Sequence, residues 1–229
     1  MNVTVMLPTL NEERTIALTI QEVRETMPHC KIVVVDSYSK DKTAFISRES
    51  GAEVILTGRG KGNAVREAVP QLAETDIVIM MDSDYTYPAR HIPEAVSLIE
   101  HGSEVIIGYR KWKDPGAMSV VNSFGNRCLS LLAGCLYLYP VRDVCTGFWG
   151  FRADILRQLE IVSPRFTLEA ELFGAVMKSH RKVRQIPIKY RARPNGSRTK
   201  LRVSDGYEIA MFLIGDSMRR WRGSQRRNV

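Results

Sequence analysis

Two aspartates with one residue between them, Asp82 and Asp84, follow directly after an apolar run at residues 77–81. Carboxylate oxygens are the ligands that Mg²⁺ and Mn²⁺ prefer. A cation held there could bridge a nucleotide diphosphate and neutralise it as a leaving group. The alternative is that one aspartate caps the next helix and the other is solvated. The position after a buried strand favours the metal site.

Two further segments have residue types that suit a nucleotide. Asp36 follows a second apolar run, and it could accept hydrogen bonds from a nucleobase or a ribose; a turn-forming aspartate explains it equally well. In the segment 58–62, Gly-Arg-Gly-Lys-Gly, the glycines let the backbone approach a ligand closely and Lys61 supplies a positive charge. This pattern is not a P-loop, and a plain flexible turn remains the alternative.

These segments lie within a regular alternation of predicted strands and helices. Strands are expected at residues 3–7, 31–35, 53–57, 76–81 and 104–108. Helices are expected between them, the first after a capping box formed by Thr9 and Glu12. Strands that are apolar on both faces predict an α/β fold with a mostly parallel sheet that helices cover on both sides. Ligands of such sheets bind beyond the carboxyl ends of the strands, where polar segments gather here.

The second half alternates less regularly. An amphipathic helix is expected at residues 119–139, a strand at 148–151, a helix at 169–179 and a strand at 182–190. A basic loop at 191–200 precedes a final helix at 204–221 and a basic tail. Because no linker or internal repeat interrupts this order, we predict a single domain over residues 1–229.

The composition is typical of a globular protein. The 229 residues are 44% hydrophobic and 25% charged, and no apolar stretch is long enough to span a membrane. The start of the sequence has no basic region of a secretory signal, so we expect a cytoplasmic protein with reduced cysteines. The net charge of +8 indicates an anionic partner: nucleic acid, an acidic membrane surface or a phosphorylated ligand.

Several motifs together resemble a known family. Those in the first half are Leu7-Pro8-Thr9-Leu10-Asn11-Glu12, Val34-Val35-Asp36-Ser37, Gly60-Lys61-Gly62 and Asp82-Ser83-Asp84. In this order they resemble family 2 glycosyltransferases of the GT-A fold. Those in the second half are Gly108-Tyr109-Arg110, Asp143-x-x-x-Gly147-Phe148 and the stretch from Ile186-Pro187-Ile188 to Lys200. They resemble the dolichyl-phosphate mannose synthase branch and its polyprenyl-phosphate relatives.

The resemblance implies roles for particular residues, with residues 1–110 as the nucleotide-sugar half, 111–203 as the acceptor half and 204–229 as a C-terminal helix and basic tail. Donor-nucleotide contacts are implied for Pro8, Leu10, Glu12, Val35, Asp36, Ser37, Lys61, Asp82 and Ser83. Mg²⁺ or Mn²⁺ would be held by Asp82, Asp84 and Thr86. Diphosphate or acceptor-phosphate contacts are implied for Arg110, Asn122, Arg193 and Lys200. Asp84 and Arg110 are the implied catalytic residues.

The acceptor is expected to be a lipid phosphate. A phosphate monoester is already nucleophilic at neutral pH, whereas a hydroxyl needs a general base. No histidine base is expected near the aspartate pair; Glu169 and Glu171 are the candidate bases for a hydroxyl acceptor. We therefore predict inverting transfer of a hexose from GDP-mannose, UDP-glucose or UDP-N-acetylglucosamine to dolichyl or polyprenyl phosphate. The alternative is a soluble transferase with a small phosphorylated acceptor such as phosphoglycerate.

The charge also bears on where the protein acts. The end of the final helix and the tail after it contain Arg219, Arg220, Arg222, Arg226 and Arg227. Such helices can lie on anionic bilayers, although core packing explains the helix at 119–139 at least as well. We expect peripheral attachment to the cytoplasmic face of a membrane, through its anionic surface or a separate membrane-anchoring partner. A nucleic-acid-binding module is disfavoured, because the basic tail has no interleaved aromatic platform.

Overall fold

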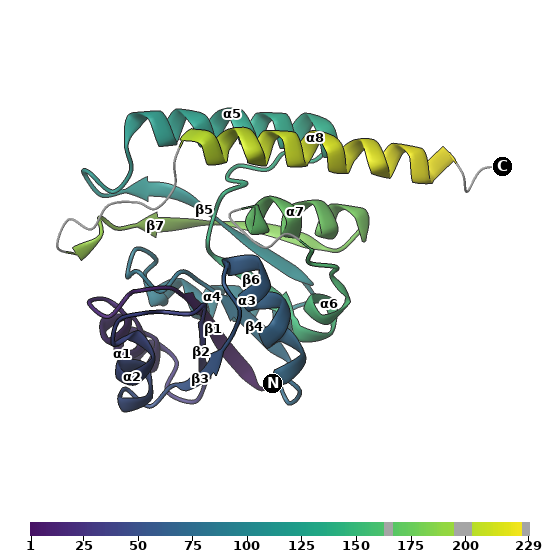
Figure 1. Ribbon diagram of the computed structural model, residues 1–229. Helices are drawn as coiled ribbons and strands as arrows, with labels where there is room; N and C mark the ends of the chain where they lie inside the picture. The colour runs from purple at the N-terminus through teal and green to yellow at the C-terminus, as the bar shows by residue number, and fades with distance from the viewer. Residues whose placement is uncertain (163–166, 195–202, 226–229) are drawn as a thin grey trace.

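The computed structural model describes residues 1–162, 167–194 and 203–225. Its described strands form one seven-stranded sheet in the order β3-β2-β1-β4-β6-β5-β7, with helices on both faces (Figure 1). This is the α/β fold that the sequence predicts.

The first half contains four parallel strands joined by helices. The strands are β1 Val3–Thr9, β2 Lys31–Asp36, β3 Glu53–Leu56 and β4 Ile77–Met80. The helices are α1 Ile16–Thr26, α2 Thr43–Glu49, α3 Lys61–Ala68 and α4 Ile92–Glu100. A 3₁₀ turn at Val69–Gln71 extends α3, and another at Ala89–His91 precedes α4. Each lies close to its predicted position, because strands buried on both faces have an unambiguous apolar pattern.

Neighbouring residues of the central strands supply two separate cores. Val33 and Val35 of β2 pack on the face that also holds Ala64 of α3. Val34, between them, packs on the opposite face with Ile20 of α1. This alternation follows from the two-residue side-chain period of a strand, and both layers fix the strand ends at which the polar segments begin.

The second half completes the sheet in mixed orientation. The strand β6 (Trp149–Arg152) is antiparallel to both β4 and β5 (Val105–Lys113), between which it lies, and β7 (Val183–Tyr190) pairs parallel to β5. The short helix α6 (Ala153–Gln158), which immediately follows β6, was not predicted. A helix this short contains too few turns for an apolar periodicity to be read from the sequence.

Two local predictions were wrong. Thr9 belongs to β1, and its hydroxyl donates to the Leu7 carbonyl, so Thr9 does not cap α1. The strand expected at 104–108 continues to Lys113 in β5, with a register irregularity between Arg110 and Trp112. Pairing with the long strand β7 gives this polar segment its backbone partners, which the sequence pattern alone does not reveal.

The second half of the chain also contains three longer helices. They are α5 Val120–Tyr137, α7 Leu168–Lys178 and α8 Val203–Gln225; α5 and α8 run side by side at the edge of the molecule (Figure 1). Ile209 and Leu213 of α8 are buried and belong to the same core as Phe173 of α7. No helix in the described part of the chain is long and apolar enough to cross a membrane.

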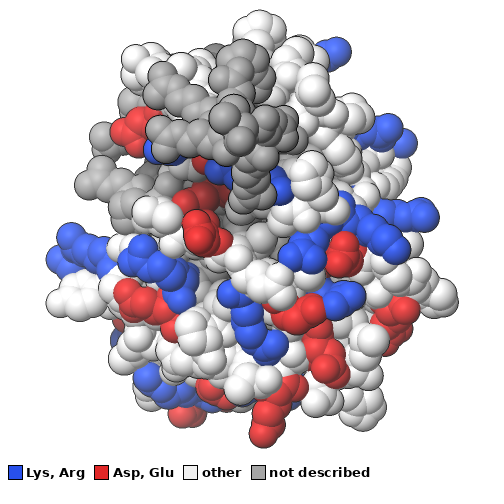
Figure 2. Space-filling model, turned by 90° about the vertical axis from the view of Figure 1, so that its right-hand side faces the viewer, with Lys and Arg blue, Asp and Glu red and all other residues white. Residues whose placement is uncertain are grey.

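The charged side chains are mixed on the face shown in Figure 2. Lysines and arginines there alternate with aspartates and glutamates around a central hollow. Proteins that track a nucleic-acid backbone usually present a contiguous basic stripe instead. The excess of positive charge is therefore not gathered into one basic patch on this face.

Candidate active site

A cleft of about 570 Å³ opens at the carboxyl ends of the parallel strands. This volume is in the range that binds a nucleotide-sized ligand. The predicted residues that line it are Pro8, Leu10, Glu12, Ser37, Lys61, Asp82, Ser83, Asp84, Arg110 and Arg193. Predicted residues as far apart in the sequence as Pro8 and Arg193 therefore meet in one cavity.

The aspartate pair is held in place by short local contacts. The Ser83 hydroxyl donates to the Pro8 carbonyl at 3.1 Å, which ties the segment to the end of β1. Oδ1 of Asp84 accepts hydrogen bonds from the Thr86 amide at 3.1 Å and the Thr86 hydroxyl at 2.5 Å. Burial, together with the negative charge of Asp82, raises the pKa of Asp84, although Arg193 opposes the shift. Asp84 thus has a fixed orientation, and its carboxylate is stabilised by a nearby positive charge such as that of Arg193.

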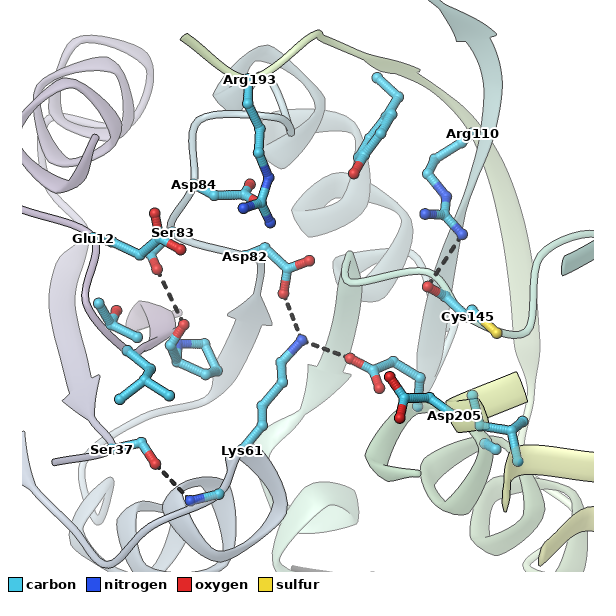
Figure 3. Close-up of a pocket in the computed structure, with 18 of the residues that line it drawn as sticks. Glu12, Ser37, Lys61, Asp82, Ser83, Asp84, Arg110, Cys145, Arg193 and Asp205 are labelled. Carbon is cyan, nitrogen blue, oxygen red and sulfur yellow. Dashed lines mark hydrogen bonds and ion pairs between the residues drawn. The ribbon is translucent and has the colours of Figure 1, made fainter. Parts of the chain in front are cut away.

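Lys61, at the start of α3, connects the two halves of the cleft (Figure 3). Its Nζ lies 2.5 Å from Asp82 Oδ1 and 2.5 Å from Glu169 Oε1 of α7. Burial alone would lower the pKa of Lys61, but these two carboxylates outweigh it and raise the pKa. Burial likewise would raise the pKa of Asp82, and the charge of Lys61 lowers it. Lys61 and Asp82 are therefore both charged.

Arg193 approaches the aspartates from the opposite side. It follows β7 and forms an ion pair with Asp84 Oδ2. Figure 3 shows Arg193 above Asp84 and Lys61 below Asp82, so one cation stands on each side of the aspartate pair. Both cations are placed where they could exchange their carboxylate partners for the phosphates of a bound nucleotide.

Arg110 forms a buried ion pair with Asp143. Its Nε and Nη2 donate to the two carboxylate oxygens at 2.7 and 2.6 Å, and Nη2 also donates to the Cys145 carbonyl at 3.1 Å. Asn126 of α5 donates to the same carboxylate at 2.9 Å. The side of the Arg110 guanidinium that could make two parallel hydrogen bonds is therefore occupied by Asp143. The phosphate contact that the resemblance implies for Arg110 stays a prediction. What remains toward the cleft is a rigidly held positive charge.

Four predicted site residues do not line the cleft. Val35 is fully buried in the core, and Thr86 is buried behind Asp84. Asn122 contributes its backbone amide to the cap of α5, where it donates to the Ser119 hydroxyl. Asp36 accepts a hydrogen bond from the Ser39 amide at 2.7 Å, as a turn-forming aspartate does. Lys200 lies outside the described residues.

The other carboxylate oxygen of Asp36, Oδ2, is buried without a hydrogen-bond partner in the described part of the chain. A contact of this oxygen with the donor nucleotide stays a prediction.

Several cleft residues were not identified from the sequence. Cys145, Tyr190, Asp205, Glu208 and Ile209 all come from the second half of the chain. Asp205, Glu208 and Ile209 lie on the first turns of α8, which reach the cleft because the helix packs on α7. The sequence gives no sign that α8 packs on α7, because the number of residues between two helices does not determine how close they lie in the fold.

Asp82 and Asp84 fit a divalent cation. Both are carboxylates that cationic partners hold in a buried cleft, and hard oxygen donors suit Mg²⁺ or Mn²⁺. Thr86 is engaged with Asp84 and supports its orientation rather than offering a separate ligand. No cluster of three or more histidine, cysteine or acidic residues suitable for a metal occurs among the described residues. A cation here would complete its shell with phosphate oxygens of the donor and with water.

Gly147 leaves the space that Asp82 occupies. A Cβ at this position would lie 2.2 Å from Asp82 Oδ2, and the Gly147 amide donates to the Tyr87 hydroxyl at 2.7 Å. The motif that follows Asp143 in the sequence therefore contains a glycine because the carboxylate lies against the backbone.

We expect Gly147→Ala to lower turnover by about a hundredfold, because the added methyl group displaces the Asp82 carboxylate. A misplacement of about 1 Å in an active site can lower the rate by about a hundredfold. Steady-state kinetics with thermal unfolding would measure it. Gly215→Ala in α8, where nothing lies within 4 Å of the added atom, is the control. Equal turnover of the two variants would contradict this role for Gly147.

Comparison with known proteins identifies the fold and the family. The fold is that of GT-A glycosyltransferases. A family model for Glycosyl transferase family 2 matches residues 4–160. The chain therefore belongs to glycosyl transferase family 2, which confirms the resemblance seen in the motifs.

The relatives are archaeal and bacterial. Glycosyltransferase AglJ of Haloferax volcanii is 33% identical over 215 residues, which cover 92% of this chain and 70% of that protein. Dolichyl-phosphate hexose transferase of the same organism is 33% identical over 191 residues, with 82% of each chain covered. Glucosyl-3-phosphoglycerate synthase of Mycobacterium tuberculosis superposes with a TM-score of 0.74 at 21% identity, over 96% of this chain and 79% of that one. The last likeness shows the fold alone.

Proposed function

We propose that this glycosyltransferase moves a hexose, with inversion, from a nucleotide sugar to dolichyl or polyprenyl phosphate. The observation that carries the proposal is the arrangement of charge in the cleft. Lys61 and Arg193 flank the aspartate pair, and Arg110 stands apart from them on β5 (Figure 3). Two separate cationic positions suit two separate phosphate groups, those of the donor and of the acceptor.

The described lining of the cleft lacks a histidine that could act as a base. The ring of His91 accepts a hydrogen bond from the Lys189 amide and does not line the cleft. Glu169 binds Lys61, and Glu171 accepts a hydrogen bond from the Val162 amide at 2.6 Å outside the lining. An acceptor that is already ionised needs none of them, and this supports a phosphate.

The donor half of the site supports a nucleotide sugar. Pro8, Leu10 and Ser37 form the wall next to Lys61, where a nucleotide would lie with its diphosphate toward the aspartates. When bound, Mg²⁺ or Mn²⁺ would neutralise the diphosphate as it leaves. Lys61 and Arg193 would exchange carboxylate for phosphate oxygens, and Arg110 would hold the acceptor phosphate by its charge. GDP-mannose, UDP-glucose and UDP-N-acetylglucosamine are the candidate donors.

The relatives support the lipid acceptor, since one of them is a dolichyl-phosphate hexose transferase. Contact with an anionic membrane surface, or with a membrane-anchoring partner, would bring the enzyme to such an acceptor on the cytoplasmic face. This belongs to the same proposal.

A second candidate function is transfer to a small phosphorylated acceptor such as phosphoglycerate. The observation that favours it is the presence of Asp205 and Glu208 in the cleft lining, because a carboxylate could serve as the base that a hydroxyl needs. The fold neighbours include a glucosyl-3-phosphoglycerate synthase crystallised with Mn²⁺, UDP and its product.

A direct comparison of acceptors tests the proposal. Purified enzyme with Mn²⁺ would be given each nucleotide sugar, with either a prenyl phosphate in detergent or phosphoglycerate in buffer. We expect sugar transfer to the prenyl phosphate. Transfer to phosphoglycerate alone would replace the first candidate with the second.

A further inference from the structure

The helix α5 exposes apolar side chains along its outer side. Its inner side is buried through Ala133 and Tyr137. Phe124 and Leu131 lie seven residues apart, at positions that return to the same side after two turns, and both are exposed. Leu138, the left-handed residue that ends the helix, is exposed as well. The exposed Cys128 and Cys135 fall between them at the same spacing. An apolar stripe thus runs along the solvent side of α5.

The helix α8 repeats this pattern. Ile209 and Leu213 are buried on its inner side, whereas Tyr207, Met211 and Met218 are exposed at helical spacing on its outer side.

The two stripes lie on neighbouring helices at one end of the molecule (Figure 1). We call this surface the α5–α8 face. It is defined by Phe124, Leu131, Leu138, Tyr207, Met211 and Met218. Scattered single apolar residues on a surface need no explanation, but two adjacent stripes mark an interaction site.

The charges of the two helices identify the partner. The α5 sequence contains no aspartate or glutamate, and its Arg127 is exposed. The sequence from residue 218 onward has five arginines and no acidic residue; they are Arg219, Arg220, Arg222, Arg226 and Arg227. A second copy of the chain would bring the same positive charges against them. An apolar face bordered by arginines instead fits the surface of an anionic lipid bilayer.

We propose that the α5–α8 face docks on an anionic membrane, with its apolar stripes in the interfacial region and the exposed Arg127 and Arg219 at the headgroups. The first turns of α8 carry Asp205, Glu208 and Ile209 into the cleft lining, so docking would place the cleft beside the bilayer. The exposed Trp112 of β5, flanked by Lys111 and Lys113, has the residue types of a membrane interface. This inference rests on the proposed function, which includes contact with an anionic membrane surface, and it names the face that makes the contact.

Vesicle co-sedimentation of the full chain tests the proposal. The vesicles would contain phosphatidylcholine alone or phosphatidylcholine with phosphatidylglycerol. The variant is Phe124→Ser/Leu131→Ser, whose side chains are 69% and 64% exposed. The matched control is Phe45→Ser/Leu56→Ser, at 62% and 66% exposure away from the α5–α8 face. Because all four side chains are exposed, both variants should fold, which thermal unfolding would verify.

We expect the wild type to bind the anionic vesicles more strongly than the neutral ones, and less as salt rises. The Phe124→Ser/Leu131→Ser variant should bind at least about tenfold more weakly than the wild type. The binding of the control should change by less than about twofold. Equal binding of variant and wild type, or no binding of the wild type, would overturn the proposal. The proposal would also be overturned if light scattering showed a wild-type dimer, if the variant were a monomer, and if neither protein bound vesicles.

A transfer assay separates this proposal from the proposed function. In detergent micelles with prenyl phosphate, the Phe124→Ser/Leu131→Ser variant should keep wild-type turnover, since neither residue lines the cleft. Vesicle binding without transfer by the wild type would leave the docking surface standing and remove the lipid-phosphate acceptor. Transfer to prenyl phosphate without vesicle binding would support the lipid-phosphate acceptor and overturn the docking surface.

Discussion

Asp84→Asn is expected to lower metal-dependent turnover by at least about a hundredfold at saturating donor, because a bound cation supplies several kcal/mol of charge stabilisation. Asparagine keeps the size of the side chain and an oxygen that can accept from Thr86, so the fold should persist. What is lost is the negative charge that faces Arg193 and the cleft. Steady-state kinetics over a Mn²⁺ titration, with Mn²⁺ binding followed by electron paramagnetic resonance, would measure the effect.

The matched control for this substitution is Asp154→Asn. Asp154 forms an exposed ion pair with Arg152 outside the cleft, so its loss should leave both turnover and Mn²⁺ binding unchanged. If purified Asp84→Asn turned over like the wild type, Asp84 would not be a metal ligand. If Mn²⁺ bound normally while turnover fell, the role of Asp84 would lie in orienting Arg193 instead.

Arg110→Lys is expected to raise the KM for the acceptor by about tenfold or more and to leave the KM for the donor nearly unchanged. Lysine keeps the charge but cannot reproduce the two parallel hydrogen bonds to Asp143 that fix the guanidinium. A positive charge that is no longer held in place stabilises the bound acceptor phosphate less, and each loss of about 1.4 kcal/mol is tenfold in binding. Kinetics with donor and acceptor varied separately would show the split.

Arg110→Ala is a less clean test. It leaves Asp143 charged and buried, which costs about 3–5 kcal/mol of stability and can unfold the chain.

Asp143→Asn is the control that distinguishes the two roles of this ion pair. It breaks the same pair, yet Arg110 stays in place and positively charged. If Arg110 serves only the fold, Arg110→Lys and Asp143→Asn lose stability alike and neither changes the acceptor KM selectively.

Glu171→Gln should lower turnover only mildly, because no proton leaves a phosphate acceptor. Loss of turnover in Glu171→Gln with a mild Arg110→Lys would indicate a hydroxyl acceptor instead.

The first half of the chain could be interpreted from sequence because its strands are buried on both faces. The apolar runs that end before Asp36 and Asp82 mark the ends of β2 and β4, and a parallel sheet brings such ends to one edge. The family motifs lie at those ends, so the resemblance and the periodicity point to the same residues. That is why the nucleotide-side residues Pro8, Lys61 and Asp84 were identified correctly as neighbours.

The partners of the charged residues were decided only by the tertiary structure. That Lys61 contacts Glu169, or that Arg110 is bound by Asp143, depends on packing between elements 108 and 33 residues apart in the sequence. Charge types in a sequence do not say which opposite charges will meet. The sequence therefore did not reveal that Asp143 binds Arg110, and the contact of Arg110 with an acceptor phosphate stays a prediction.

The outer faces of α5 and α8 show the same limit. The sequence alone determined that both segments form amphipathic helices, since the 3.6-residue period of apolar residues is local. It did not determine which apolar residues face inward, because both helices have more of them than one buried side can hold. Packing against α7 selected Ile209 and Leu213 for the core and left Met211 and Met218 exposed. Burial depends on neighbours that only the folded chain brings together.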